Sequence, residues 1–207
     1  MEGHDRSVHT YSSKTGAWSH KKCDWGYYRI APKSPNAYVN VMLHLILYDG
    51  NIRLVSVDVE GKIQKIILPP FQAGKFWPLS DYVGQSQGRS HYIYHEEETF
   101  DLRCEQGRSD ELLIWVLEDY DTQQWVLKDT VSFLRLFGKR CCQIFKDYDV
   151  VAIHPDHNLV YLVHHCNSKL ISYDMDSKEV SHLCTLDMAI GAAHHSVCSL
   201  LLGVVST

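Results

Sequence analysis

Short runs of apolar residues, some of them alternating with polar ones, divide the chain into segments of β-strand length. Strands of this kind are expected at residues 41–48, 112–117, 150–153 and 159–163. They are rich in Val, Ile, Leu and Tyr, which pack well on a pleated sheet. A long apolar stripe with helical period is missing, so helix is expected only near Ser80–Val83 and in the tail after Asp187. The pattern predicts an all-β chain.

One layout occurs four times: an apolar strand, a turn that opens with an acid or a hydroxyl, and an apolar anchor that begins the return strand. The turns open at Ser12, Asp58, Asp119 and Asp174, and the anchors are Trp18, Ile63, Trp125 and Val180. Asp or Ser at the start of a turn accepts a backbone N–H two residues later and ends the strand there. The anchor then packs on the strand just left. Trp18 and Trp125 are therefore predicted core residues.

The spacing of these turns indicates how the hairpins are arranged. Successive turn positions lie 46, 61 and 55 residues apart, close to the period of kelch-type propeller blades, about 50 residues. A further strand, containing His44, His91 or Val160, precedes each of the last three hairpins. The expected unit is one inner strand followed by a hairpin, and the expected fold is a partial propeller of about three to four antiparallel blades. A β-sandwich or barrel is the alternative, because it also contains irregularly spaced hairpins.

Charge and composition limit the classes of partner and the cellular compartment that we expect for this chain. The 207 residues include 20 basic and 25 acidic side chains, for a net charge of −5 without a Lys/Arg block, so we expect no binding to nucleic acid or to a membrane surface. The apolar run 196–205 is too short to span a bilayer, and residues 1–18 are too polar for a signal peptide. Seven cysteines, an odd number, favour free thiols in a reducing compartment, the cytoplasm or the nucleus.

The blade motifs also resemble those of a known family. The stretches that carry the resemblance are Tyr11–Trp18, Ile114–Asp121, Trp125–Lys128, Val151–Pro155 and Leu170–Met175. They are similar to the F-box-associated, kelch-like propeller region of plant F-box proteins, most closely to the grass branch. Because the resemblance fades after Leu186, we divide the chain into a propeller segment, residues 1–186, and a divergent C-terminal tail, residues 187–207.

The resemblance implies a function and shows two departures. In that family an F-box binds the adaptor of a cullin-type ubiquitin ligase, and the propeller that follows recognises the client protein. The residues before Tyr11 are too few for an F-box, so we expect a fragment that reaches the adaptor only through a missing F-box. Val41 stands where the family prefers Gly, and Ser90 precedes His91. A decoy or non-functional fragment is the first alternative.

No residue is predicted to act in catalysis, and no cofactor or metal is expected. Ser86 lies between glycines, but the helix that follows a nucleophile elbow is missing. The paired acids of the last two turns are solvated, whereas a general acid needs an apolar pocket. His91 and His95 would lie about 13 Å apart on a strand, too far to share one ion. A glycosidase-like propeller enzyme is therefore the weaker alternative.

Client binding is expected on exposed loops. Trp, Tyr and Arg are enriched in interface hot spots, and the loop candidates of these types are Trp77, Arg89, Arg103 and Arg108. Burial of Trp77 over a blade edge is the alternative role for that residue. Three or four blades do not close a ring, so open edges invite self-association, and we expect an oligomer or a poorly soluble chain.

Overall fold

The computed structural model describes residues 7–23, 25, 26, 28–30, 36–48, 51–70, 82–95, 111–138 and 148–186. Antiparallel sheets make up nearly all of it, in four groups along the chain. The first group is a hairpin, here called the half-blade, of β1 (Ser7–Ser12) and β2 (Ala17–Lys22). Blade A contains β3 (Arg29–Ile30), β4 (Ala37–Val39), β5 (Met42–Tyr48), β6 (Ile52–Val57) and β7 (Ile63–Ile67).

The remaining two groups are regular four-stranded blades. Blade B contains β8 (Tyr82–Ser86), β9 (Arg89–His95), β10 (Glu111–Asp119) and β11 (Gln124–Ser132), and continues into α1 (Phe133–Phe137). Blade C contains β12 (Tyr148–Ile153), β13 (Leu159–His164), the 3-10 turn η1 (His165–Asn167), β14 (Lys169–Asp174) and β15 (Val180–Thr185). In the described part of the chain, no helix has the length and apolar character needed to cross a membrane.

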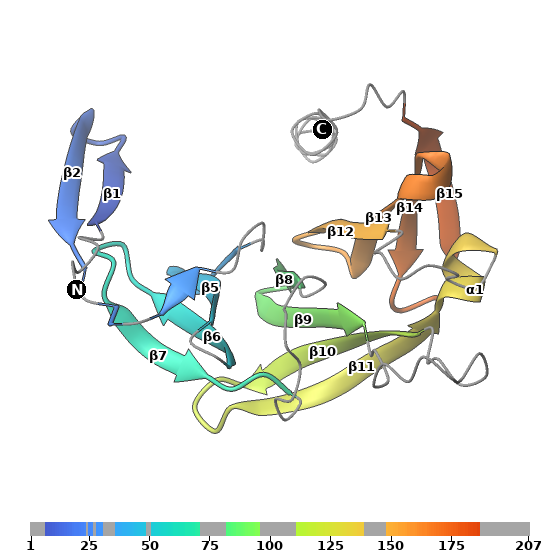
Figure 1. Cartoon of the computed structure of the whole chain (residues 1–207), viewed down its shortest axis with the longest axis horizontal. Helices are drawn as coiled ribbons and strands as arrows, with labels where there is room; N and C mark the ends of the chain where they lie inside the picture. The colour runs from blue at the N-terminus through green and yellow to red at the C-terminus, as the bar shows by residue number, and fades with distance from the viewer. Residues whose placement is uncertain are drawn as a thin grey trace.

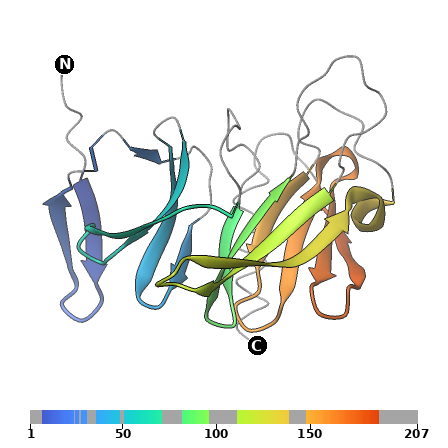
Figure 2. The same cartoon turned by 90° about the horizontal axis from the view of Figure 1, so that it is seen from below.

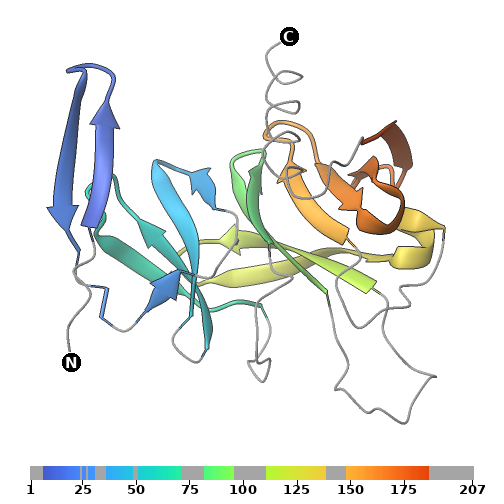
Figure 3. The ribbon, with the colours of Figure 1, turned by 45° about the horizontal axis from the view of Figure 1, so that its top comes forward.

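The half-blade and the three blades stand side by side along an open arc (Figure 1). The half-blade forms one end of the arc and blade C the other, as Figure 3 also shows. Strands β4, β8 and β12, each the first of its blade, lie next to one another along the inside of the arc. Strands β7, β11 and β15, each the last of its blade, lie on the outside. The turns of β1–β2, β8–β9 and β12–β13 point to one side of the arc, here called the turn face (Figure 2). This arrangement confirms an all-β, propeller-like fold.

Hydrogen bonds from backbone N–H groups to the turn-opening side chains confirm the repeated turn. One carboxylate oxygen of Asp58 accepts the backbone N–H groups of residues 60 and 62, both at 2.9 Å. Asp119 accepts those of residues 121 and 122 at 2.7 and 3.0 Å, and Asp174 those of residues 176 and 177 at 2.8 and 3.1 Å. These backbone bonds lower the pKa of all three carboxyl groups. The side chain of Ser12 binds the N–H of residue 15 more weakly, at 3.3 Å.

The expected three-stranded unit is wrong: each full blade has a further strand at its inner edge. His44, His91 and Val160 lie on the second strand of their blades, because β4, β8 or β12 pairs on its inner side. The first strands of blades A and B are short, with three and five residues, so they show little alternation. In blade C the strand expected at residues 150–153 is part of β12. The other predicted strands are present.

The helix predictions also need correction. Residues 82 and 83 of the expected turn near Ser80–Val83 begin β8, while residues 80 and 81 and the tail after Asp187 lie outside the described residues. Helix α1 was not expected, because a helix of five residues shows no periodicity. Its ends follow standard rules: the Ser132 hydroxyl accepts the N–H of Arg135, and Gly138 ends it at φ 73°.

Apolar side chains pack mainly between neighbouring blades, along three interfaces that we call seams. The half-blade/A seam holds Trp25, Leu45, Leu47, Val55 and Val57. The A/B seam includes Ile46, Leu54, Val83, Tyr92 and Leu113, and the B/C seam includes Ile93, Ile114, Phe133, Val160 and Tyr173. Trp125 is half-buried in the A/B seam, but Trp18 is 71% exposed. The core prediction for Trp18 is therefore wrong, because an anchor is buried by the blade that precedes it.

Candidate functional site

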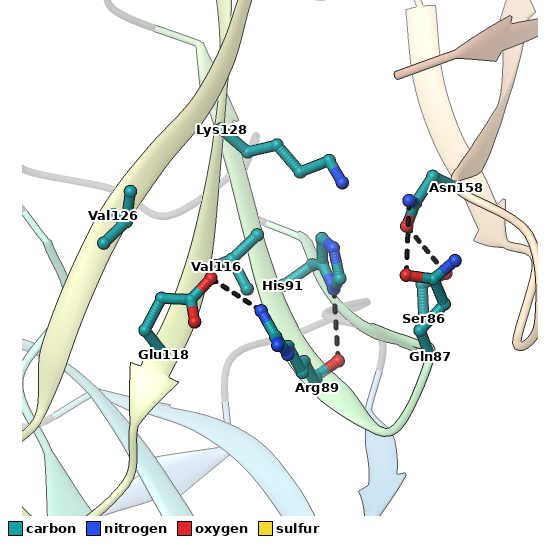
Figure 4. A pocket seen from close by; sticks show the side chains of 9 residues that line it. All are labelled: Ser86, Gln87, Arg89, His91, Val116, Glu118, Val126, Lys128 and Asn158. Atoms are coloured by element: carbon teal, nitrogen blue, oxygen red, sulfur yellow. Dashed lines mark hydrogen bonds and ion pairs between the residues drawn. The ribbon is translucent and has the colours of Figure 1, made fainter. Parts of the chain in front are cut away.

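A cleft of about 220 Å³ opens between blades B and C. Strands β9, β10 and β11 form one wall, and the β8–β9 and β12–β13 turns form the other (Figure 4). The residues around it are Ser86, Gln87, Arg89, His91, Val116, Glu118, Val126, Lys128 and Asn158. The cleft thus draws on two blades, and a molecule bound there would contact both.

Hydrogen bonds between two turns fix one side of this cleft. The β8–β9 turn has only two residues, Gln87 at φ 51° and Gly88 at φ 72°, which suits a tight hairpin. The Ser86 hydroxyl donates to the backbone carbonyl of His157 at 3.0 Å, and the Gln87 N–H donates to that of Pro155 at 2.6 Å. Ser86 also lies 3.2 Å from the Asn158 side-chain oxygen. The two turns therefore hold each other across the B/C seam.

His91 is the unusual group in the cleft. Its side chain is only 2% exposed, and its Nδ1–H donates to the Arg89 carbonyl at 3.1 Å. A carbonyl can only accept, so Nδ1 carries the proton and Nε2 carries the lone pair. Nε2 is buried and has no hydrogen-bond partner. Burial lowers the pKa of His91 to about 4, so the ring is neutral at pH 7.

Two ion pairs border the cleft. The Arg89 guanidinium lies 2.7 Å from the Glu118 carboxylate, within blade B. The Lys128 ammonium lies 3.2 Å from the Asp176 carboxylate, across the seam. Asp176 also accepts the Asn158 amide N–H at 2.7 Å, and this bond is the main reason that its pKa is lowered. The charges of the cleft are balanced, and both cations keep further N–H donors.

This arrangement supplies hydrogen bonds rather than a nucleophile and its base. The Ser86 hydroxyl bonds to blade C and not to His91, and the imidazole has no carboxylate to orient it. In the described ranges no three His, Cys, Asp or Glu side chains come together as metal ligands do. His95 packs edge-on against Phe133 at 4.9 Å, away from His91. The cleft is equipped to bind a small polar group.

Of the four residues predicted for partner binding, the structure places Arg89 in the cleft. Trp77, Arg103 and Arg108 fall outside the described residues. Lys128 and Asn158 were not singled out from the sequence, and His91 was weighed only as a metal ligand. The Gln87-Gly88 dipeptide before β9 signals a tight hairpin and could have drawn attention to this edge.

One protein family is clearly similar to this chain, over residues 1–198. No curated protein matches the chain. A solved protein of unknown function from Bacteroides caccae is similar at 8% identity and a TM-score of 0.46, over 86% of this chain and 54% of that one. The chain thus spans about half the length of that protein. A family model described as "F-box protein At3g26010-like, beta-propeller" matches residues 1–198. The chain therefore belongs to this family of F-box protein β-propellers.

Proposed function

We propose that this propeller recognises the client of a cullin-type ubiquitin ligase. The observation that carries the proposal is the family match over residues 1–198, since the propeller of an F-box protein is a protein-interaction module. The resemblance of the blade motifs to the grass branch supports it. In this proposal the adaptor contact belongs to an F-box, the client is a protein, and the chain works in the cytoplasm or the nucleus.

The B/C cleft is the proposed contact for the client. It opens on the turn face, where Arg89 and Lys128 offer N–H donors and His91 offers a buried acceptor. Val126, which is 42% exposed, adds an apolar surface beside them. A peptide segment with a hydroxyl or an amide side chain matches these groups, because it both donates and accepts. An unpaired buried acceptor discriminates against ligands that lack a donor.

Quantitative affinity purification from plant extract tests this proposal. The immobilised chain is compared with an Arg89→Ala/Lys128→Ala double variant and with Lys21→Ala, which removes an exposed ion pair to Glu60 at the other end of the arc. We expect one set of proteins that the wild type and Lys21→Ala retain and that the double variant loses at least tenfold. Equal recovery by the wild type and both variants would exclude the cleft.

The same purification separates the ligase role from the decoy alternative. Cullin and adaptor subunits among the specific proteins would place the chain in a ligase. A client recovered without them would favour a decoy that competes with a full-length receptor. Circular dichroism spectra of the three proteins must coincide, so that a loss of binding is not a loss of folding.

A further inference from the structure

In each of the three full blades, the anchor residue contacts the blade that precedes it along the chain. Ile63 packs in the half-blade/A seam with Val8 and Cys23. Trp125 packs in the A/B seam and Val180 in the B/C seam. The anchor is thus a docking residue of the propeller ring, and its burial depends on the presence of a preceding blade.

Trp125 shows the contact in detail. Its indole Nε1–H donates to the backbone carbonyl of Leu68, one residue beyond the last strand of blade A, at 2.8 Å. Gln123 reinforces it: its amide donates to the Ile66 carbonyl at 3.1 Å and accepts the Leu68 N–H at 3.1 Å. The ring of Tyr92 meets the indole edge-on, at 6.0 Å between centroids. The partner of an anchor is therefore the backbone of an outermost strand.

Trp18 occupies the same position in the half-blade, and among the described residues it has no such partner. It lies opposite Tyr11, as Trp125 lies opposite Leu117, and the two rings are 5.3 Å apart. Tyr11 is 55% and Trp18 71% exposed. His9 and His20, the next cross-strand pair on the same face, stack at 5.7 Å. We call these four side chains the aromatic strip.

The opposite face of the half-blade is already used. Val8 packs in the half-blade/A seam, and Lys21 pairs with Glu60 of blade A at 2.7 Å. Alternation along β1 and β2 therefore turns the aromatic strip away from blade A. It faces the direction in which a preceding blade would stand.

Strand β15 offers the surface that an anchor contacts. It is the outermost strand of blade C, as β7 is of blade A, and all of its residues after Val180 are exposed. Leu186 follows β15 as Leu68 follows β7. The aromatic strip and β15 lie at opposite ends of the arc (Figures 1 and 3), so they meet only between two molecules.

We propose that the aromatic strip docks on β15 of a second copy of this chain, with Trp18 in the role that Trp125 plays between blades A and B. The contact is head to tail, and two copies that each supply both surfaces close a ring without leaving a free end. Trp and Tyr are the residues that most often dominate such interfaces. The inference does not depend on the proposed client.

Sedimentation equilibrium over a hundredfold concentration range tests the proposal. The wild type should form dimers, and Trp18→Ser should weaken the dimer about tenfold or more. Tyr38→Ser is the matched control, because Tyr38 is a similarly exposed aromatic residue in blade A, at 57%, and should leave the dimer unchanged. A monomeric wild type would overturn the proposal, as would equal losses in both variants.

A photo-crosslinking residue at position 11 identifies the occupant. Crosslinks to residues 180–186 of a second copy are expected. Crosslinks to residues 7–22 would show a symmetric contact between two strips and would overturn the head-to-tail arrangement. Far-ultraviolet circular dichroism of each variant keeps a folding defect separate from a binding defect.

Discussion

The A/B and B/C seams are built from the same repeat but are held together differently. Across the A/B seam Lys65 pairs with the Asp121 carboxylate at 3.4 Å. Apart from those of Lys65, the polar contacts between the described residues of this seam are uncharged: the Ser90 hydroxyl lies 2.8 Å from His44 Nδ1, and Trp125 and Gln123 bind backbone groups. The B/C seam combines uncharged bonds, such as that of the Ser86 hydroxyl to the His157 carbonyl, with charged ones. Asp129 binds Lys178 at 3.0 Å and also the Tyr173 hydroxyl.

The difference between the two seams indicates where the molecule can bind another protein. Backbone-directed bonds and aromatic rings occur in both seams, but in the B/C seam long charged side chains also bridge the blades and leave a cleft beside them. Charged side chains at a surface contribute little to stability and can exchange partners. Removing a charged side chain of the B/C seam should therefore cost less stability than removing an aromatic ring of the A/B seam, and the B/C seam is the one with a cleft available for recognition.

Lowering the pH should reduce the free energy of unfolding more than any substitution below, because it protonates one buried histidine beside each seam. His44 and His91 are buried, and burial lowers the pKa of each to about 4. The unfolded chain binds protons near pH 6.5, so this stability is complete above that pH and is lost as the pH falls towards 4. We expect a loss of about 2 kcal/mol for each ring between pH 7 and 4.5.

Urea unfolding at several pH values measures this loss. His44→Gln and His91→Gln should each flatten the pH dependence, while His157→Gln, an exposed ring in the β12–β13 turn, should leave it as in the wild type. An unchanged slope in both buried-site variants would contradict the explanation.

Truncation of one side chain in each seam should sharpen the comparison. Trp125→Ala removes a half-buried ring and a hydrogen bond to blade A, and should lower the free energy of unfolding by about 2–3 kcal/mol. Trp125→Phe keeps most of the packing and should cost about 1 kcal/mol. Lys128→Ala removes the partly exposed pair with Asp176 and should cost less than about 1 kcal/mol. Chemical denaturation ranks the three; a larger effect of Lys128→Ala would reverse our assignment of the two seams.

Much of this fold was readable from the sequence because its key contacts are local. Asp58, Asp119 and Asp174 each bind N–H groups within four residues, so the hairpins follow from composition. The first strands of blades A and B were missed although each joins the next strand through a two-residue turn, because strands of three and five residues show too little alternation. Trp18 was misplaced because the burial of an anchor depends on a neighbouring blade.

The cleft was less predictable than the fold. Its walls come from β9, β10, β11 and two turns, and no spacing in the sequence brings these together. Arg89 was chosen for its residue type and loop position. The significance of His91 lies in the missing partner of one nitrogen, which only packing can create.

A small effect is also expected at the hairpin that enters the A/B seam. Val41, 68% exposed, sits at φ 64° in the β4–β5 turn, while the β8–β9 turn has Gly88 at φ 72°. A β-branched residue in the left-handed region costs about 1–2 kcal/mol relative to Gly. Val41→Gly should therefore raise the unfolding free energy by about 1 kcal/mol, seen as a higher melting temperature. Gly88→Val is the reciprocal change and should lower it; unchanged stability in both would show that the turns relax.

Strand β11 has a consequence for how the molecule comes apart. Its first residues bind blade A through Trp125, and its later residues bind blade C through Lys128 and Asp129. In a simple repeat array, each unit touches only its neighbours and can melt stepwise from an end. Here β11 contacts both blade A and blade C, so a force that separates blade C from blade B also acts on the strand that binds blade A. Blades A, B and C should therefore unfold together, in one cooperative transition.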